Sequence, residues 1–232
     1  MTTTTSHSGR LRTVGLWWLA LTAVAIAVFG PLRYLTDSLP SLAADGDPLA
    51  GNYAGRPSWA HLALYAHIAF GGLALLLSPV QLSARVRARA PRLHRGLGRV
   101  VLVCIGAGAA GGMVLAPMNL AGPIGTAGFG TLAVLWIGFA LLGLRAIRRG
   151  EVAVHRRWMI RTFALTYAAV TLRLWLAVLV PVLGGDFRAA YLIVPFLCWV
   201  PNLVVTEMLL RKHMSSIMSR EVDGDVSTMT RH

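Results

Sequence analysis

The chain has 232 residues, of which 56% are hydrophobic and 13% are charged, and its mean hydropathy is +0.63. Soluble domains carry about 25% charged residues, so this chain lacks the residues that a water-exposed surface requires. The net charge is +13, but the basic residues form short clusters between long apolar runs, which argues against a soluble nucleic-acid-binding protein, a soluble enzyme, a disordered chain and a disulfide scaffold. The composition predicts an integral membrane protein that contacts the lipid bilayer and has no nucleic-acid partner.

Six apolar runs are long enough for the roughly 20 residues that a membrane-spanning helix requires. In chain order they cover approximately residues 14–34, 59–82, 97–116, 125–144, 158–180 and 189–210. These runs and their short connections use nearly the whole chain. We therefore predict one all-α domain over residues 1–232, a polytopic bundle of six transmembrane helices. The Thr- and Ser-rich ends, residues 1–12 and 214–232, are predicted to be disordered tails.

The basic residues predict the orientation of these spans. Eighteen of the 22 Lys and Arg residues lie in the two ends and in the connections after the second and fourth spans, whereas the other connections hold only Arg33, Arg56 and Arg188. Positively charged connections stay in the cytoplasm. We predict cytoplasmic termini and a location in the cell (inner or plasma) membrane. The connection 37–58 then lies outside, and its composition fits a lid over an outer cavity and an untethered loop equally well.

Polar and small residues share one face on each of the second, third, fifth and sixth spans. These faces predict a polar seam with a ligand cavity, for which the candidate residues are His67, Gln81, Thr166, Arg173 and Asn202. His67 and Arg173 each lie about 12 Å inside the outer end of their spans at a rise of about 1.5 Å per residue, so we expect them to share a cavity. Arg173 either extends to the membrane surface or faces an anionic group as a fixed cation.

A His-Arg pair occurs at both junctions that are predicted to be cytoplasmic. His94 and Arg95 precede the apolar part of the third span, and His155 and Arg156 precede that of the fifth. Pro91 suits the first turn of a helix, which would include His94 in that helix. Two imidazoles at similar depth on neighbouring helices are able to ligate haem iron, and the two arginines would be available for its propionates. The alternative is that both histidines are ordinary interfacial residues.

Several motifs of the middle of the chain are similar to a known family. Residues 61–182 resemble an uncharacterised family of bacterial multi-pass membrane proteins, the domain of unknown function 2306. The resemblance is carried by His67 with Gly71-Gly72, Pro-Arg-Leu-His-Arg-x-x-Gly-Arg at 91–99, His-Arg-Arg-Trp-Met-Ile-Arg at 155–161 and Thr-Leu-Arg-Leu-Trp at 171–175. It implies a multi-pass topology in the bacterial inner membrane and no established activity.

A looser similarity is to the cytochrome b561-like bundles. In those bundles the third and fifth spans supply the ligands of one haem, a role that His94 and His155 would match. The second and fourth spans supply the ligands of another haem, and His67 would match one of them. The fourth span of this chain has no histidine, so the similarity does not extend to a second haem.

Three functions are compatible with these patterns. The leading one is a small electron-transfer protein that holds one b-type haem between His94 and His155; no other cofactor is expected. The second is a carrier or accessory protein that binds an anionic or amphipathic ligand against Arg173, such as a small molecule, a quinone or a lipid-like molecule. The third is a membrane enzyme that acts on a lipid-like substrate with His67 as its base. The sequence assigns no substrate and no oligomeric state.

Overall fold

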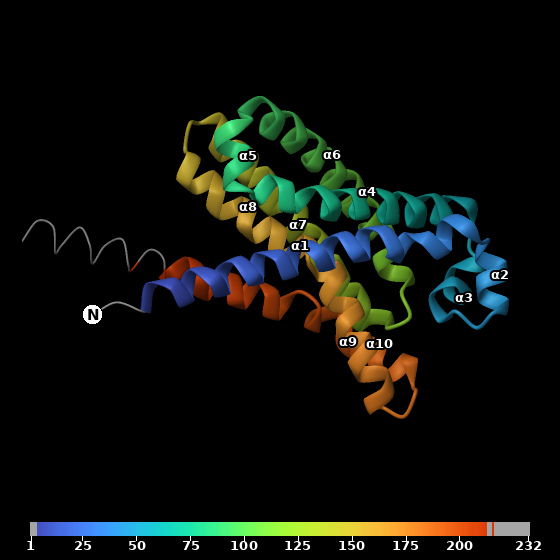
Figure 1. Ribbon diagram of the computed structural model, residues 1–232. Helices are drawn as coiled ribbons and strands as arrows, with labels where there is room; N and C mark the ends of the chain where they lie inside the picture. The colour runs from blue at the N-terminus through green and yellow to red at the C-terminus, as the bar shows by residue number, and fades with distance from the viewer. Residues whose placement is uncertain (1–3, 213–214, 216–232) are drawn as a thin grey trace, which may run out of the picture.

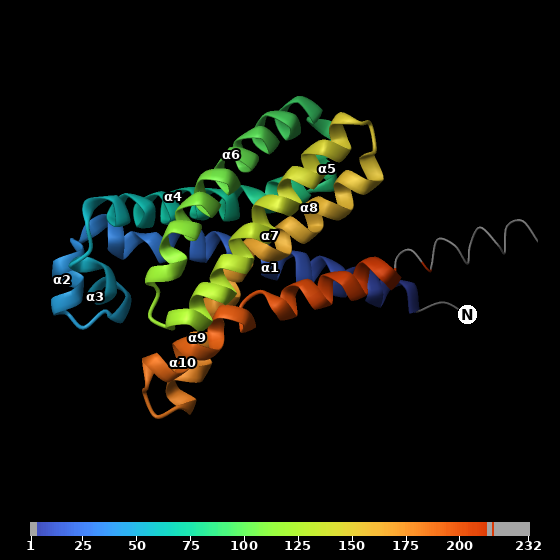
Figure 2. The ribbon, with the colours of Figure 1, turned by 180° about the vertical axis from the view of Figure 1, so that it is seen from behind.

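The computed structural model describes residues 4–212 and 215, and the chain there is helical with short turns (Figures 1 and 2). Its elements are α1 (Thr4–Thr36), α2 (Leu39–Ala44), α3 (Pro48–Ala54), α4 (Ser58–Leu82), α5 (Ala84–Arg89), α6 (Pro91–Leu115), η1 (Ala116–Met118), α7 (Gly122–Arg148), α8 (Val152–Thr166), α9 (Ala168–Val182), α10 (Phe187–Leu197) and a last helix over residues 200–212.

The described residues contain six segments that are long and apolar enough to cross a membrane. They are Trp17–Thr36, Ser58–Leu82, Pro91–Met118, Gly122–Arg148, Val152–Val182 and Phe187–Lys212. The predicted all-α fold with six spans is therefore confirmed.

Three helices begin earlier than the apolar runs do. Helix α6 starts at Pro91, in the first turn where proline is tolerated, and α8 starts at Val152, so both include their junction histidines. Helix α1 starts at Thr4. Residues 4–12 of the predicted tail therefore lie in the helix of the first span, which continues through this polar segment. The predicted tail 214–232 lies outside the described residues except for Ser215.

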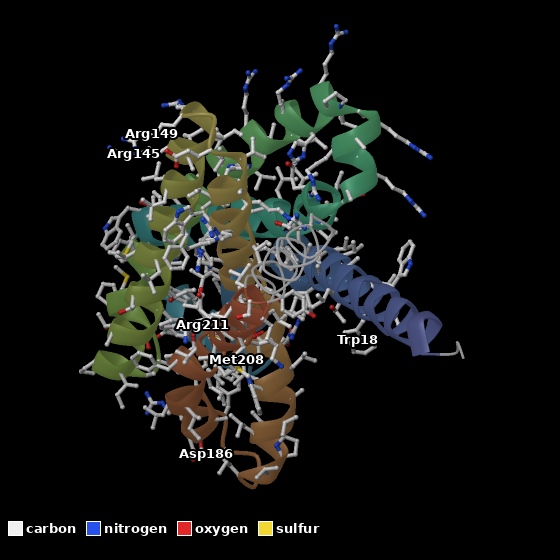
Figure 3. The ribbon with its side chains drawn as sticks, turned by 90° about the vertical axis from the view of Figure 1, so that its left-hand side faces the viewer. Trp18, Arg145, Arg149, Asp186, Met208 and Arg211 are labelled. Atoms are coloured by element: carbon white, nitrogen blue, oxygen red, sulfur yellow. The ribbon has the colours of Figure 1, made fainter. Side chains whose placement is uncertain are left out.

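The two ends of the bundle differ in structure and charge. One end, here called the arginine end, carries α5 and the turn between α7 and α8, where Figure 3 shows Arg145 and Arg149. The opposite end, here called the hairpin end, carries α2 and α3 together with the turn between α9 and α10, which includes Asp186. The charge distribution predicts that the arginine end faces the cytoplasm.

Glycines allow α4 and α6 to pack closely. A Cβ atom added at Gly111 would lie 2.7 Å from the carbonyl oxygen of Ala63, and one added at Gly108 would lie 3.2 Å from the amide nitrogen of Gly71. Small residues at such contacts let membrane helices pack through their backbones. This contact fixes the position of α4 against α6 beside the cavity that is described below.

The fifth and sixth spans are interrupted near the middle of the bundle. The fifth changes direction at Tyr167, between α8 and α9, and the sixth does so at residues 198–199. Pro201, the second residue of the last helix, lacks the amide hydrogen that would bond to the end of α10, which accounts for the second interruption. The Thr162 and Thr166 hydroxyls donate to carbonyls one turn back, at 2.9 Å each, and such bonds tend to bend a helix, which contributes to the first.

A single amide joins the two interruptions. The Asn202 Nδ2 atom donates to the carbonyl oxygens of Ala164 and Cys198, at 3.2 and 3.1 Å, and to the Thr171 hydroxyl oxygen at 3.1 Å. The Thr171 hydroxyl in turn donates to the Cys198 carbonyl oxygen. Backbone groups freed inside a membrane require such partners, so these side chains stabilise both interruptions.

The connection between the first two spans is a folded roof, defined here as α2 and α3. Leu39, Leu42 and Ala50 of this roof are buried, and Leu64 and Leu115 belong to the same apolar cluster. Three polar contacts fix it in place: Arg33 Nη1 with Asp47 Oδ2 at 3.4 Å, Asn52 Nδ2 with the Met118 carbonyl oxygen at 2.7 Å, and His61 Nε2 with the Tyr53 carbonyl oxygen at 2.8 Å. An untethered loop is therefore excluded.

Candidate functional site

A cavity of about 270 Å³ extends from the middle of the bundle toward the hairpin end. Its wall is mostly aliphatic and aromatic and comes from all six spans and from α3. An apolar cavity with a few polar groups is the usual form of a small-molecule site. The polar side chains of the wall include Tyr34, Tyr53, His67, Asn119, Thr166, Arg173 and Tyr191.

His67 is held against α6 with one ring nitrogen occupied. Its Nδ1 atom lies 2.8 Å from the carbonyl oxygen of Gly108, which accepts only, so Nδ1 carries the hydrogen and donates it. The ring fits there because a Cβ atom at Gly112 would lie 3.2 Å from Nδ1. In the neutral ring Nε2 then keeps a lone pair, which makes His67 a hydrogen-bond acceptor in the wall of the cavity.

Arg173 reaches back toward the middle of the bundle. Its Nη1 atom donates to the carbonyl oxygen of Ala169, one turn earlier in α9, at 2.7 Å, and its guanidinium lies against Gly30 of α1. A Cβ atom at Gly30 would be 3.1 Å from Nη2. A side chain that extended to the membrane surface would point the other way, toward the hairpin end. The guanidinium of Arg173 is therefore directed toward the middle of the membrane and not toward its surface.

No carboxylate neutralises Arg173 in the part of the chain that the structure describes. The ion pairs there are Arg33 with Asp47 and Arg161 with Glu207. Glu207, the carboxylate of the last span, accepts from Arg161 Nη2 at 2.8 Å, so it is already paired. Arg173 is therefore a cation in the cavity wall that has no carboxylate counterion among the described residues.

Thr166 lines the cavity near the middle of the bundle, and Tyr53 lines it from the roof. The Thr166 hydroxyl accepts from Trp136 Nε1 at 2.8 Å and donates to the Thr162 carbonyl oxygen, so its hydrogen-bonding groups serve the protein. Tyr53 lies in α3, outside the spans, and burial raises the pKa of its hydroxyl. The Tyr53 hydroxyl therefore stays neutral and keeps its hydrogen at physiological pH.

Two of the five predicted cavity residues lie elsewhere. The Gln81 Nε2 atom donates to the carbonyl oxygen of His94 at 3.2 Å, near the arginine end. Asn202 joins the two helix interruptions, as described above. Neither residue lines the cavity, whereas His67, Thr166 and Arg173 do.

The two junction histidines have different surroundings. His155 Nδ1 lies 2.8 Å from the carbonyl oxygen of Gly143 in α7, so it donates and Nε2 keeps the lone pair. His94 Nδ1 is buried and has no hydrogen-bond partner. Arg95 and Arg156 are exposed nearby in sequence. Free ring nitrogens of this kind are suitable iron ligands, but the cavity described above contains neither histidine.

Arg87 of α5 is a further basic residue near the arginine end. Arg87 Nη1 donates to the Leu82 carbonyl oxygen at 2.8 Å, which closes the end of α4. Burial, and to a smaller extent the positive charge of Arg156, lower the pKa of the Arg87 guanidinium. The arginine end thus concentrates positive charge beside the two histidines.

The family model described as "Predicted membrane protein (DUF2306)" matches residues 64–210, more than half of the chain. The chain belongs to this family. The match begins within α4 and ends in the last helix, so it extends further toward the C-terminus than the resemblance over residues 61–182. Neither the comparison with curated proteins nor the comparison with solved structures found a match.

Part of the cavity of this DUF2306 protein comes from outside the matched region. Helix α1 contributes Ile26, Ala27, Pro31 and Tyr34, and α3 contributes Leu49 and Tyr53. The sequence prediction missed these residues because it assigned the seam to the second, third, fifth and sixth spans. The spacing of Ile26, Ala27, Pro31 and Tyr34 follows one face of a helix, but that face is apolar except for Tyr34 and gives no polar signal.

Proposed function

We propose that this DUF2306 protein binds an amphipathic ligand with an anionic group, which pairs with Arg173 in the cavity. The observation that supports the proposal is the inward direction of Arg173, whose guanidinium has no carboxylate partner among the described residues. A charge kept inside a membrane without a partner is costly. An anionic ligand offsets that cost.

The chemistry of the cavity wall defines the ligand further. One Arg173 nitrogen is used by the Ala169 carbonyl oxygen, and the others remain available for the two oxygens of a carboxylate or phosphate. His67 Nε2 accepts a hydrogen bond, and the aliphatic wall accommodates hydrocarbon. The cavity of about 270 Å³ is slightly smaller than the roughly 300–1,000 Å³ of common ligand sites, so it holds a headgroup and the beginning of a chain.

A series of three amphiphiles tests the proposal on the wild-type protein. Palmitate, hexadecanol and hexadecyltrimethylammonium have the same chain length, and their headgroups are anionic, neutral and cationic. A ligand that binds only the folded protein raises the unfolding temperature by mass action. We expect palmitate to raise the unfolding temperature in a neutral detergent and the other two compounds to leave it unchanged. Equal stabilisation by hexadecanol would show that only hydrocarbon is recognised and would contradict the proposal.

A single b-type haem between His94 and His155 is a second candidate. The observation that favours it is the pair of ring nitrogens without hydrogen bonds, Nδ1 of His94 and the lone pair of His155 Nε2. The haem would supply one-electron chemistry, and the exposed arginines at 95 and 156 would neutralise its propionates.

A difference spectrum tests the second candidate. Protein purified from cells supplied with a haem precursor should show a Soret band, and either His94→Ala or His155→Ala should remove it. The variant His61→Ala is the matched control, because His61 lies in the opposite half of the bundle and should keep the band. A wild-type protein without a Soret band would exclude the haem and would leave the anion proposal unaffected.

A further inference from the structure

The roof closes the cavity at the hairpin end. Leu49 and Tyr53 of α3 form part of the wall, and the roof is fixed to α1, to the start of α4 and to η1 by the three polar contacts described above. Each contact joins a different element to the roof. A ligand that arrived from the water at this end would have to displace several of them.

The side of the cavity between α1 and α9 is less closed. Arg173 belongs to the cavity wall and yet is exposed, and its neighbour Leu174 is 47% exposed on the outside of the bundle. Figures 1 and 2 both show α1 and α9 crossing near the middle of the bundle and diverging toward the hairpin end. Because Arg173 lines the cavity and is also exposed on the outside of the bundle, we take the cavity to open between α1 and α9 at this residue.

The edges of this opening are defined by a few contacts. Near the middle of the bundle, the Thr22 and Tyr167 hydroxyls are hydrogen-bonded at 2.7 Å, which holds α1 to the junction of α8 and α9. Toward the hairpin end the contact is between Gly30, which has no side chain, and the guanidinium of Arg173. The cavity lining on the same two helices includes Ile26 and Ala27 on α1 and Ala169 and Leu172 on α9.

The depth of the opening determines what reaches it. Arg173 is about eight residues inside the end of its span, which at about 1.5 Å per residue is roughly 12 Å below the membrane surface. At that depth the surroundings are hydrocarbon and the first part of the lipid chains. In the predicted orientation this is the outer leaflet.

We infer that the ligand is a single-chain anionic amphiphile that resides in this leaflet and enters the cavity sideways, between α1 and α9. The inference rests on the proposed function, because it takes Arg173 as the binding group. The anionic group pairs with Arg173 at the opening, and the part of the chain that the cavity is too small to hold remains in the bilayer. Gly30, which has no side chain, leaves the space that the Arg173 guanidinium occupies at the opening.

Photolabelling in vesicles tests the route. Protein in phosphatidylcholine vesicles is mixed with vesicles that contain a palmitate analogue with a diazirine on its chain, and the labelled fraction is measured by mass spectrometry after flashes at increasing times. Gly30→Leu should slow labelling about tenfold, which corresponds to a barrier higher by about 1.4 kcal/mol. Gly15→Leu is the matched control on the same helix, because nothing lies within 4 Å of a Cβ there, and its labelling rate should equal that of the wild type.

A variant that weakens the attachment of the roof tests the alternative route, entry from the water at the hairpin end. Arg33→Gln removes the contact with Asp47 and should leave the labelling rate unchanged if entry is lateral. Faster labelling of Arg33→Gln, together with an unchanged rate for Gly30→Leu, would overturn the lateral route. Butyrate, which has the same carboxylate but arrives from the water, should not compete with the analogue; effective competition would identify a soluble anion as the ligand and would overturn the inference.

The positions of the label on the wild-type protein test the inference independently of any variant. The chain should label outward-facing residues of α1 and α9 beside the opening, such as Phe29 and Leu174. Labels confined to Leu49 and Tyr53 of the roof would contradict lateral entry even if Gly30→Leu displaced Arg173. An unlabelled wild-type protein would instead refute the proposed function, so the two failures are distinguishable.

Discussion

Replacement of Arg173 by leucine is expected to abolish palmitate binding, and replacement by lysine is expected to weaken it by about tenfold or more. Leucine removes the charge that pairs with the carboxylate. Lysine keeps the charge but loses the planar fork that holds two oxygens at once. Lysine also cannot reproduce both the contact with the Ala169 carbonyl oxygen and the two-point contact with the ligand.

Titration of the unfolding temperature with palmitate measures both effects. Arg211→Lys and Arg211→Leu are matched controls in the last helix, where the side chain is exposed, and they should bind palmitate like the wild type. All variants must first show wild-type expression and an unchanged unfolding temperature without ligand. Wild-type affinity in Arg173→Lys would mean that the fork is not used, and wild-type affinity in Arg173→Leu would refute the site.

Gly111→Ala is expected to destabilise the fold more than a single methyl group normally does. Its Cβ atom would lie 2.7 Å from the carbonyl oxygen of Ala63 and 3.1 Å from Cβ of His67. These atoms belong to, or are directly attached to, the backbone of α4, so no side-chain rotation relieves the contact and the two helices must separate. Overpacking of this kind costs about 1–3 kcal/mol of unfolding free energy. It also shifts His67 at the cavity.

The native thiols provide the measurement for this variant. Cys104 and Cys198 are both buried, so a fluorogenic maleimide reacts with them as the protein unfolds. Gly106→Ala is the matched control on the same helix, because nothing lies within 4 Å of a Cβ there. The unfolding temperature should fall for Gly111→Ala and stay the same or rise slightly for Gly106→Ala. Equal behaviour of the two variants would show that α4 and α6 are not in close contact.

The six spans could be predicted from the sequence because hydropathy depends on composition over about 20 residues and not on tertiary contacts. The expected depth of His67 and Arg173 has the same origin, since the rise of a helix is constant. In the structure both residues line one cavity. The direction of the Arg173 side chain could not be predicted, because a side chain toward the membrane surface and one toward the middle of the bundle fit the same position in the sequence. Only its contact with the Ala169 carbonyl oxygen distinguishes the two.

The interruption at Tyr167 illustrates a different limit. The run 158–180 contains no proline and no glycine, and its threonines Thr162 and Thr166 do not by themselves locate a change of direction. The interruption depends on Asn202, which is distant in sequence and supplies the hydrogen bonds that the freed carbonyl groups require. For the same reason Asn202 was assigned to the cavity: its polarity is visible in the sequence, but its partners are not. The sequence did not decide whether the connection 37–58 is a lid or an untethered loop, because the capping and burial of its short helices depend on what they pack against.

The amide of Asn202 has a mechanical consequence. Because one side chain bonds to carbonyl groups on both sides, α9 cannot rotate relative to α8 without either breaking these bonds or moving the last helix as well. The two half-length segments near the hairpin end, α9 and α10, are thereby coupled at a common hinge. A tilt about this hinge displaces both segments together and changes their separation from α1 while the α4–α6 pair stays fixed.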